Sequence, residues 1–108
     1  MQPDKIRTYL GFCIRAGKLT TGVNAVQTVK KGVYLLIADT SVAKNSWKEI
    51  LKLKVKFGCP LLMAERLESL VCKENCKLAA VREKSLAEAI YREAGKGQIT
   101  EYIGGMEE

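Results

Sequence analysis

The chain has 108 residues, of which 18 are lysine or arginine and 12 are aspartate or glutamate, so its formal net charge is +6. It contains no histidine, which excludes Ser-His-Asp triads, Cys-His dyads and histidine metal sites. The length suits one domain, and 47% hydrophobic with 28% charged residues is a globular rather than a disordered composition.

The positive charge is concentrated in the first half of the chain. Residues 1–58 contain eleven basic and three acidic residues, a balance of +8, whereas residues 59–108 contain seven and nine, a balance of −2. Such asymmetry favours a polyanionic partner, either nucleic acid or an anionic membrane surface. The longest apolar run, residues 33–38, is too short to span a membrane, and the N-terminus lacks signal-peptide features. We therefore expect a cytoplasmic protein without membrane association.

The first quarter of the chain predicts two helices with a short connector or strand at residues 18–21. The first helix has an apolar stripe at spacings of three and four, formed by Ile6, Leu10, Cys13 and Ile14, and Gly17 suits its C-terminal cap. The second has Thr21 as a plausible N-cap and valines at every third position, and it should run for about three turns before Gly32.

The rest of the chain alternates short apolar strands with helices. Strands are predicted at 33–38, 59–64 and 77–81, and helices at 42–57, at 66–71 and from a Ser85/Glu88 capping box to Gly95. Because continuous apolar strands are typical of sheets covered on both faces, the predicted fold is a three-layer α/β/α sandwich around a small mixed sheet of about four strands. Residues 1–95 form the single domain, and 96–108 a polar, Gly-rich, loose tail.

The segment Thr21-Gly22-Val23-Asn24-Ala25 is the first candidate binding site. A helix start offers free N–H groups to phosphate, glycine permits close backbone approach, and the amide of Asn24 can recognise a base edge. The same residues also suit ordinary helix capping, and this alternative stays open. Neither a phosphate loop nor a dinucleotide fingerprint follows Gly22, so we expect no nucleotide cofactor.

Lysines form the second candidate. One helix face would carry a lysine at every fourth position, namely Lys44, Lys48, Lys52 and Lys56. This face either contacts phosphates or is simply the solvent-exposed outer side of the helix. Lys30 and Lys31 precede Gly32, where cations at a helix end are favourable in any case.

Catalytic and metal chemistry have little support. Glu65 and Glu68 are three residues apart on a predicted short helix, which is an ordinary arrangement of surface charges. Asp39 follows the first buried strand and suits either a ligand site or a turn and cap. The four cysteines lack the paired spacing of a zinc site, and we expect buried or idle thiols. No enzyme, metal or cofactor is predicted.

The run Leu10-Gly11-x-Cys13-x-Arg15-Ala16-Gly17-Lys18-Leu19-x-x-Gly22, together with Lys30-Lys31-Gly32 and the strand that ends in Ala38-Asp39, resembles the ribosomal L-seven-Ae/L-thirty-e superfamily, most closely its small bacterial members. The resemblance covers roughly residues 5–92. It implies an α/β/α sandwich that binds RNA at kink-turns, which are sharply bent elements with sheared G·A pairs.

By position, the resemblance places Gly22, Val23, Asn24 and Ala25 on the glycine-led RNA motif and residues 65–70 on a second, partly apolar contact loop. Asn24 matches a position that touches a guanine edge. The expected RNA-binding residues are therefore Lys18, Thr21, Gly22, Val23, Asn24, Ala25, Lys30, Lys31, Arg66 and Leu67.

Departures from the family leave other functions open. Ala25 replaces a Glu or Gln, and Thr28 replaces a Lys, that contact RNA in many members. The leading hypothesis is a non-catalytic, ribosomal-protein-like RNA binder. The alternatives are a protein-interaction domain that kept the fold without specific RNA recognition, or a recognition module that acts with an RNA-modifying enzyme.

Overall fold

The sheet at the centre of the protein is built from short strands that are mostly apolar. In the computed structural model, which describes residues 2–71, 73–94 and 99–101, the strand order is β1-β4-β2-β3-β5. The strands are β1 (Leu19–Thr21), β2 (Leu35–Asp39), β3 (Leu61–Ala64), β4 (Leu78–Val81) and β5 (Ile99–Glu101). Strands β2 and β3 pair in parallel, with Leu36 opposite Leu61, and the pairs β1–β4, β2–β4 and β3–β5 are antiparallel, so the sheet is mixed.

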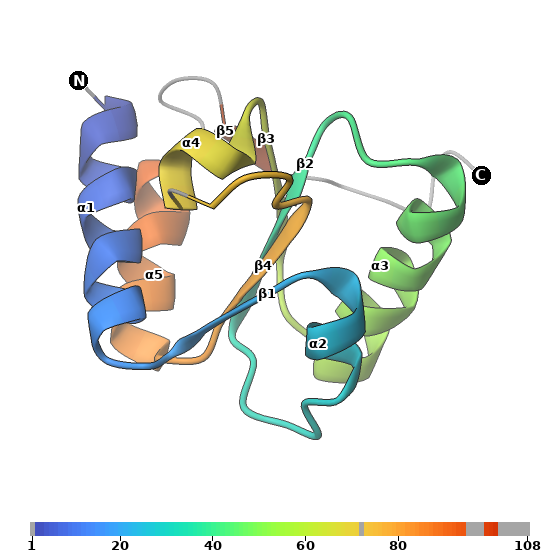
Figure 1. The fold of residues 1–108 in the computed structure, drawn as a ribbon. Helices are drawn as coiled ribbons and strands as arrows, with labels where there is room; N and C mark the ends of the chain where they lie inside the picture. The colour runs from blue at the N-terminus through green and yellow to red at the C-terminus, as the bar shows by residue number, and fades with distance from the viewer. Residues whose placement is uncertain (1, 72, 95–98, 102–108) are drawn as a thin grey trace.

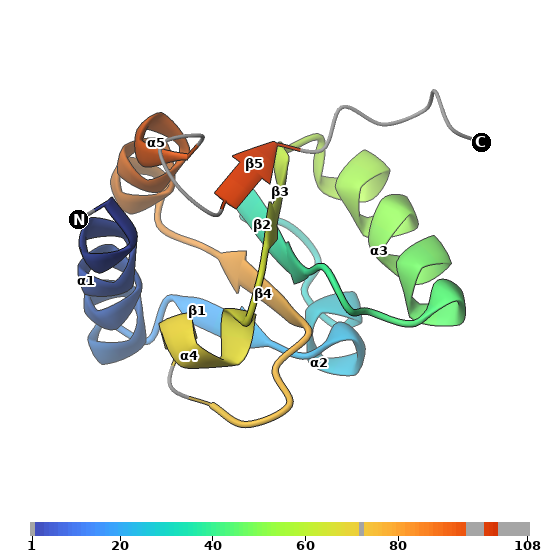
Figure 2. The same cartoon turned by 90° about the horizontal axis from the view of Figure 1, so that it is seen from above.

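Helices cover both faces of the sheet, which explains why every residue of β2 and β4 is buried. Figure 1 shows α1, α4 and α5 on one side and α2 and α3 on the other, and Figure 2 shows the same layers from above. The helices are α1 (Gln2–Arg15), α2 (Val23–Gln27), α3 (Lys44–Phe57), α4 (Leu67–Val71) and α5 (Lys84–Glu93). The three-layer α/β/α sandwich predicted from the sequence is confirmed.

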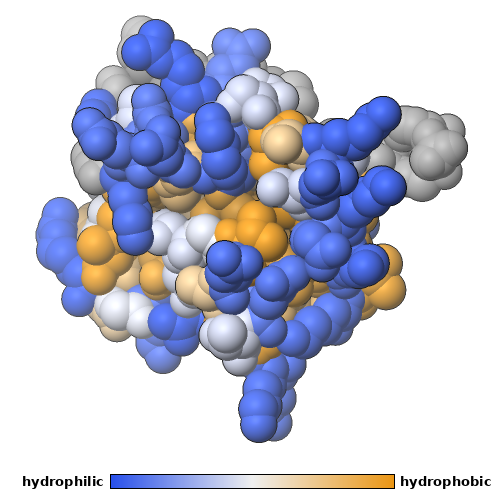
Figure 3. Space-filling view, turned by 45° about the vertical axis from the view of Figure 1, so that its right-hand side comes forward, coloured by the Kyte–Doolittle hydropathy of each residue, from blue (hydrophilic) through white to orange (hydrophobic). Residues whose placement is uncertain are grey.

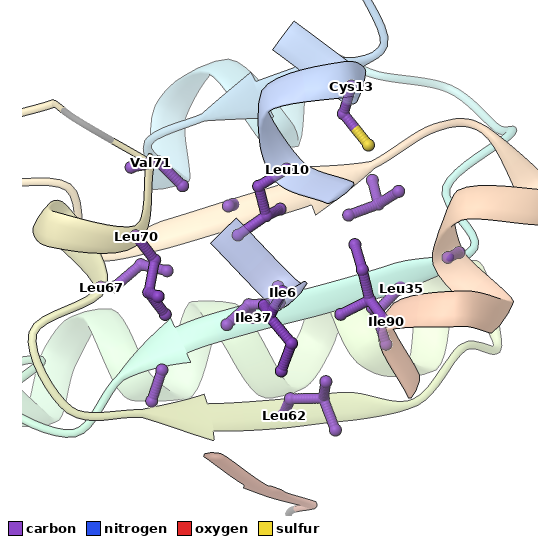
Figure 4. Close-up of a cluster of buried hydrophobic side chains, with 14 of the residues drawn as sticks. Ile6, Leu10, Cys13, Leu35, Ile37, Leu62, Leu67, Leu70, Val71 and Ile90 are labelled. Atoms are coloured by element: carbon purple, nitrogen blue, oxygen red, sulfur yellow. The ribbon is translucent and has the colours of Figure 1, made fainter. Parts of the chain in front are cut away.

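Two hydrophobic cores fill the space between the layers. The first packs α1, α4 and α5 onto one face of the sheet through fully buried side chains that include Leu10, Ile37 and Ile90 (Figure 4). The second packs α2 and α3 onto the other face around Val26, Leu36 and Ile50. Hydrophilic side chains cover most of the face in Figure 3, with hydrophobic ones between them.

Several predicted boundaries are wrong for local reasons. The second helix has five residues rather than three turns, because the N–H and the hydroxyl of Thr28 both donate to the carbonyl oxygen of Ala25 and close it. Gly22, not Thr21, is its N-cap. At the start of α5 the cap is Glu83, whose carboxylate accepts the N–H of Leu86 at 2.7 Å, rather than the Ser85/Glu88 pair.

Two further expectations need correction. Ile14, predicted on the buried stripe of the first helix, is 47% exposed. Three residues of the predicted tail form β5, which pairs antiparallel with β3 at the sheet edge, so the sheet has five strands in the part described. The rest of the predicted tail, residues 96–98 and 102–108, lies outside the described residues.

Candidate nucleic-acid interface

The turn between β1 and α2 is built around Gly22. Its φ of +92° is a backbone conformation that side-chain-bearing residues rarely adopt, while a Cβ built there would meet nothing within 4 Å. Glycine is therefore required by the backbone and not by crowding. The N–H of Gly22 donates to the carbonyl oxygen of Leu78 at 2.8 Å, which fixes the turn to β4. Asn24 and Ala25, which follow, are exposed.

An open hollow, the α2–α3 depression, lies over this turn and has a volume of about 830 Å³. One wall consists of residues 21–25 and Gln27, and the other of Asn45, Ser46 and Glu49 on α3. Every predicted residue from Thr21 to Ala25 thus lines the same concave surface. Amides and a hydroxyl on both walls can donate and accept hydrogen bonds, as base edges and sugar hydroxyls require.

One acidic side chain faces this depression. Glu49 accepts a hydrogen bond from Nε2 of Gln27 at 3.0 Å, and its other carboxylate oxygen lies 3.6 Å from Nζ of Lys52. The depression therefore presents one carboxylate to an incoming ligand, partly compensated by its lysine neighbour. A polyanion should bind with its phosphates away from Glu49.

Asp39 organises the adjacent edge of the sheet, where β2 and β3 end. Its carboxylate is buried and accepts hydrogen bonds from the N–H and the hydroxyl of Ser41 and, at 2.7 Å, from the N–H of Leu67 at the start of α4. Burial alone would raise the pKa of Asp39, but these hydrogen bonds and the charge of Lys77 outweigh it and hold the pKa below its ordinary value. The turn-and-cap alternative for Asp39 agrees with this geometry.

Two lysines that were not predicted lie at the same edge. Nζ of Lys73 donates to Oγ1 of Thr21 at 3.0 Å, and Nζ of Lys77 donates to Oγ of Ser41 at 2.7 Å while lying 3.8 Å from the Asp39 carboxylate. Their sequence context is an ordinary polar loop. Only the pairing of β4 with β1 and β2 brings that loop to the candidate site.

The remaining predicted residues are more scattered. Arg66 is exposed with a φ of 57° at the turn between β3 and α4, on the edge that Asp39 organises. The prediction for Leu67 is wrong, because its side chain is fully buried in the first core and cannot present an apolar surface to RNA. Lys18 lies at the far end of β1 from Gly22, about 10 Å along an extended strand from Thr21.

Lys30 and Lys31 are exposed, but in the loop between α2 and β2 rather than at a helix end. The anion attraction expected from a three-turn helix is also weaker, since five residues sum to a small dipole. The site therefore offers a ligand its shape and its side chains more than a helix dipole.

The lysine row on α3 divides into two parts. Nζ of Lys56 donates to the carbonyl oxygen of Val29 at 2.8 Å and lies 5.1 Å from the centre of the Phe57 ring, so it ties α3 to the end of α2. Lys52 pairs with Glu49. Lys44 and Lys48 are exposed to solvent. The row is thus partly structural.

Cys13 and Cys59 are buried. Burial raises the pKa of Cys13 and of Cys59 to about 11, so both stay protonated at neutral pH. In the described ranges, no three His, Cys, Asp or Glu side chains gather closely enough to hold a metal ion. Within the same ranges, every helix is too short or too polar to cross a membrane.

Comparison with known proteins extends the fold assignment. No protein-family model and no curated protein sequence matches the chain. A solved structure from Bacillus halodurans, described as a protein with unknown function, matches with a TM-score of 0.67 and 23% identity over 82% of this chain and 95% of that one. The two proteins therefore have a similar fold, and at this identity the likeness extends no further.

Proposed function

We propose that this protein is a non-catalytic RNA-binding protein, similar to ribosomal large-subunit proteins, that binds structured RNA at kink-turn-like elements in the cytoplasm. The observation that carries the proposal is the α2–α3 depression, because residues 22–25, which resemble the glycine-led RNA motif of the superfamily, all line it. The exposed amide of Asn24 stands beside Gly22, whose missing side chain leaves the approach open.

The shape of the surface favours distorted RNA over a regular duplex. The deep, narrow major groove of A-form RNA does not admit protein side chains, so sequence-specific RNA recognition mostly uses bends, bulges and unpaired bases whose edges are accessible. A concave surface with amides on both walls is complementary to such a projecting element. The exposed Lys30 and Lys31, in the loop that follows α2, would contact flanking phosphates.

Ala25 limits how selective this binding can be. A Glu or Gln at this position would add a polar contact worth about 1 to 3 kcal/mol, and the methyl group of Ala25 cannot make it. We therefore assign base recognition chiefly to Asn24, and overall affinity to contacts with the RNA backbone.

Substitution of Asn24 tests the proposal. Asn24→Ala removes the base-reading amide from an exposed position, so we expect the affinity for a kink-turn RNA to fall by about 5- to 100-fold, while the affinity for the same RNA with its G·A pairs replaced by Watson–Crick pairs barely changes. Fluorescence anisotropy titrations of both RNAs measure this.

The matched control is Ser85→Ala on the exposed start of α5, which should leave both affinities unchanged. If wild-type protein binds neither RNA, or if Asn24→Ala binds both RNAs as the wild type does, the α2–α3 depression is not an RNA site.

A second candidate function, a protein-interaction domain, is favoured by a different surface. Tyr34 and Tyr91 are 43% and 41% exposed and line a hollow of about 350 Å³ with Pro60. Under this alternative, Tyr34→Ser would disrupt association with a partner protein in a pull-down experiment, whereas Asn24→Ala would leave that association unchanged.

A further inference from the structure

Ile14 is an apolar side chain that the fold leaves at the surface. It is 47% exposed near the end of α1 and lines a hollow of about 300 Å³ together with Leu19, Thr21, Val71 and Lys73. We call this hollow the β1–α4 groove. Its walls are three apolar side chains, one hydroxyl and one ammonium group. Neither the fold nor the proposed kink-turn contacts require Ile14 to be exposed.

The β1–α4 groove and the α2–α3 depression meet at the edge of the sheet. Side chains alternate along a strand, so Leu19 and Thr21 point to the same face, and Leu19 packs on the core beneath α1 and α4. The α2–α3 depression lies on the opposite face, beside α3. Thr21 lines both hollows, and β1 is the terminal strand in the sheet order. A chain that leaves the depression and passes over β1 therefore arrives in the groove.

One ammonium group lines this apolar floor, and two further cationic residues are next to its lining residues in the chain. Lys73 lines the groove and donates to Oγ1 of Thr21, where the two hollows meet. The exposed Arg15 and Lys18 adjoin Ile14 and Leu19 in the chain. The nearest carboxylate in the chain is that of the exposed Glu74, next to Lys73. Single-stranded nucleic acids bind to surfaces of this kind, in which bases contact apolar or aromatic groups and cations follow the backbone.

We propose that the β1–α4 groove is a second RNA subsite, which holds an unstacked base from the single strand that continues beyond the structured element bound in the α2–α3 depression. The inference depends on the proposed RNA-binding function and extends it. The base lies against Ile14, Leu19 and Val71, and its flanking phosphates lie near Lys73 and Lys18. This arrangement also gives a role to Lys18, which is too far along β1 to reach a ligand at Gly22.

An added peptide strand fits the surface less well. β1 has only three residues, so it offers few backbone groups for strand addition. The charged groups that line or adjoin the groove are mostly positive, and the groove is continuous with the depression. Both features favour a nucleic acid.

The test compares two RNAs, a kink-turn stem alone and the same stem with a five-nucleotide single-stranded extension. We expect wild-type protein to bind the extended RNA at least about fivefold more tightly, as one base contact of about 1 kcal/mol gives. Ile14→Ser should remove that difference and leave the affinity for the stem alone unchanged. Val55→Ser, at the 82% exposed Val55 on α3, is the matched control and should change neither affinity.

A second variant tests the cationic part. Lys73→Gln should reduce the salt dependence of binding to the extended RNA by about one phosphate contact, whereas Lys84→Gln on α5 should not. Circular dichroism confirms that the variants fold. If wild-type protein binds both RNAs equally, or if Ile14→Ser weakens both equally, the second subsite is wrong and the proposed function stands. If wild-type protein binds neither, both fail.

Discussion

Asp39 is a buried charged side chain at the edge of the sheet beside the candidate interface. Its carboxylate accepts hydrogen bonds from Ser41 and Leu67 and lies near Lys77. It thereby joins the turn after β2, the start of α4 and the loop before β4. A buried carboxylate with these partners stabilises one arrangement of three loops, because removing it leaves two backbone N–H groups without an acceptor.

Asp39→Asn should lower the free energy of unfolding by about 1 to 3 kcal/mol at pH 7. The folded protein holds the pKa of Asp39 below its ordinary value of 3.8, so the ionised group contributes stability above pH 3.8, and this contribution disappears as the pH falls through the folded-state pKa. Urea titrations at pH 7 and pH 3 should therefore show a smaller difference between wild type and variant at pH 3. An equal difference at both pH values would contradict this role of the charge.

Glu49 is the residue that should oppose a polyanion in the α2–α3 depression. Glu49→Gln removes the carboxylate and releases Lys52 from its ion pair, so we expect the affinity for RNA at low salt to rise by about two- to fivefold, as for a partly exposed charge. Anisotropy titrations measure the change. Glu88→Gln, on the exposed side of α5, is the control and should have no effect. A fall in affinity would show that Glu49 binds RNA directly.

The turn between β1 and α2 is the part of the site that depends most on one residue. Gly22 has a φ of +92° and donates its N–H to Leu78, so its conformation sets the direction in which Asn24 leaves the sheet. A glycine inside a helix, by contrast, destabilises the fold, because the helix does not need its conformational freedom and folding must restrict it.

Two glycine substitutions separate these cases. Gly22→Ala places a Cβ on a strained backbone and should destabilise the protein by about 1 to 3 kcal/mol and weaken RNA binding. Gly11→Ala lies within α1, where the added Cβ would meet only a flexible arginine end at 3.9 Å, and should stabilise the protein by about 0.5 to 1 kcal/mol. Urea midpoints measure both. If both variants are equally stable, the turn does not require glycine.

The elements show what the sequence could and could not predict. The continuous apolar run before Asp39 predicts the strand, because a strand that is buried on both faces is apolar throughout. The apolar stripe on α3 predicts the long helix, because a helix that is buried on one face repeats its apolar residues every three or four positions. The helix after Gly22 was predicted too long, since repeated valines do not reveal that the Thr28 hydroxyl closes the helix. The groups beside the candidate site at Lys73, Lys77 and Glu49 come from distant segments, so only the tertiary fold brings them together.

The positive charge of the first half of the chain is distributed over several surfaces. Lys56 and Lys52 are engaged within the fold, and Lys18 precedes Leu19, which lines the β1–α4 groove. The α2–α3 depression and the β1–α4 groove share Thr21, at the end of the edge strand β1. A third hollow, at Tyr34 and Tyr91, is lined by neither Thr21 nor any other residue of these two hollows.

The most direct test of RNA binding through this surface is the salt dependence of the affinity for a kink-turn RNA, measured by anisotropy at 50 mM and 200 mM monovalent salt. If the bound RNA makes two or three phosphate contacts, counterion release predicts that the affinity falls by about 10- to 40-fold between the two conditions. The same weak affinity at both salt concentrations would contradict the proposal.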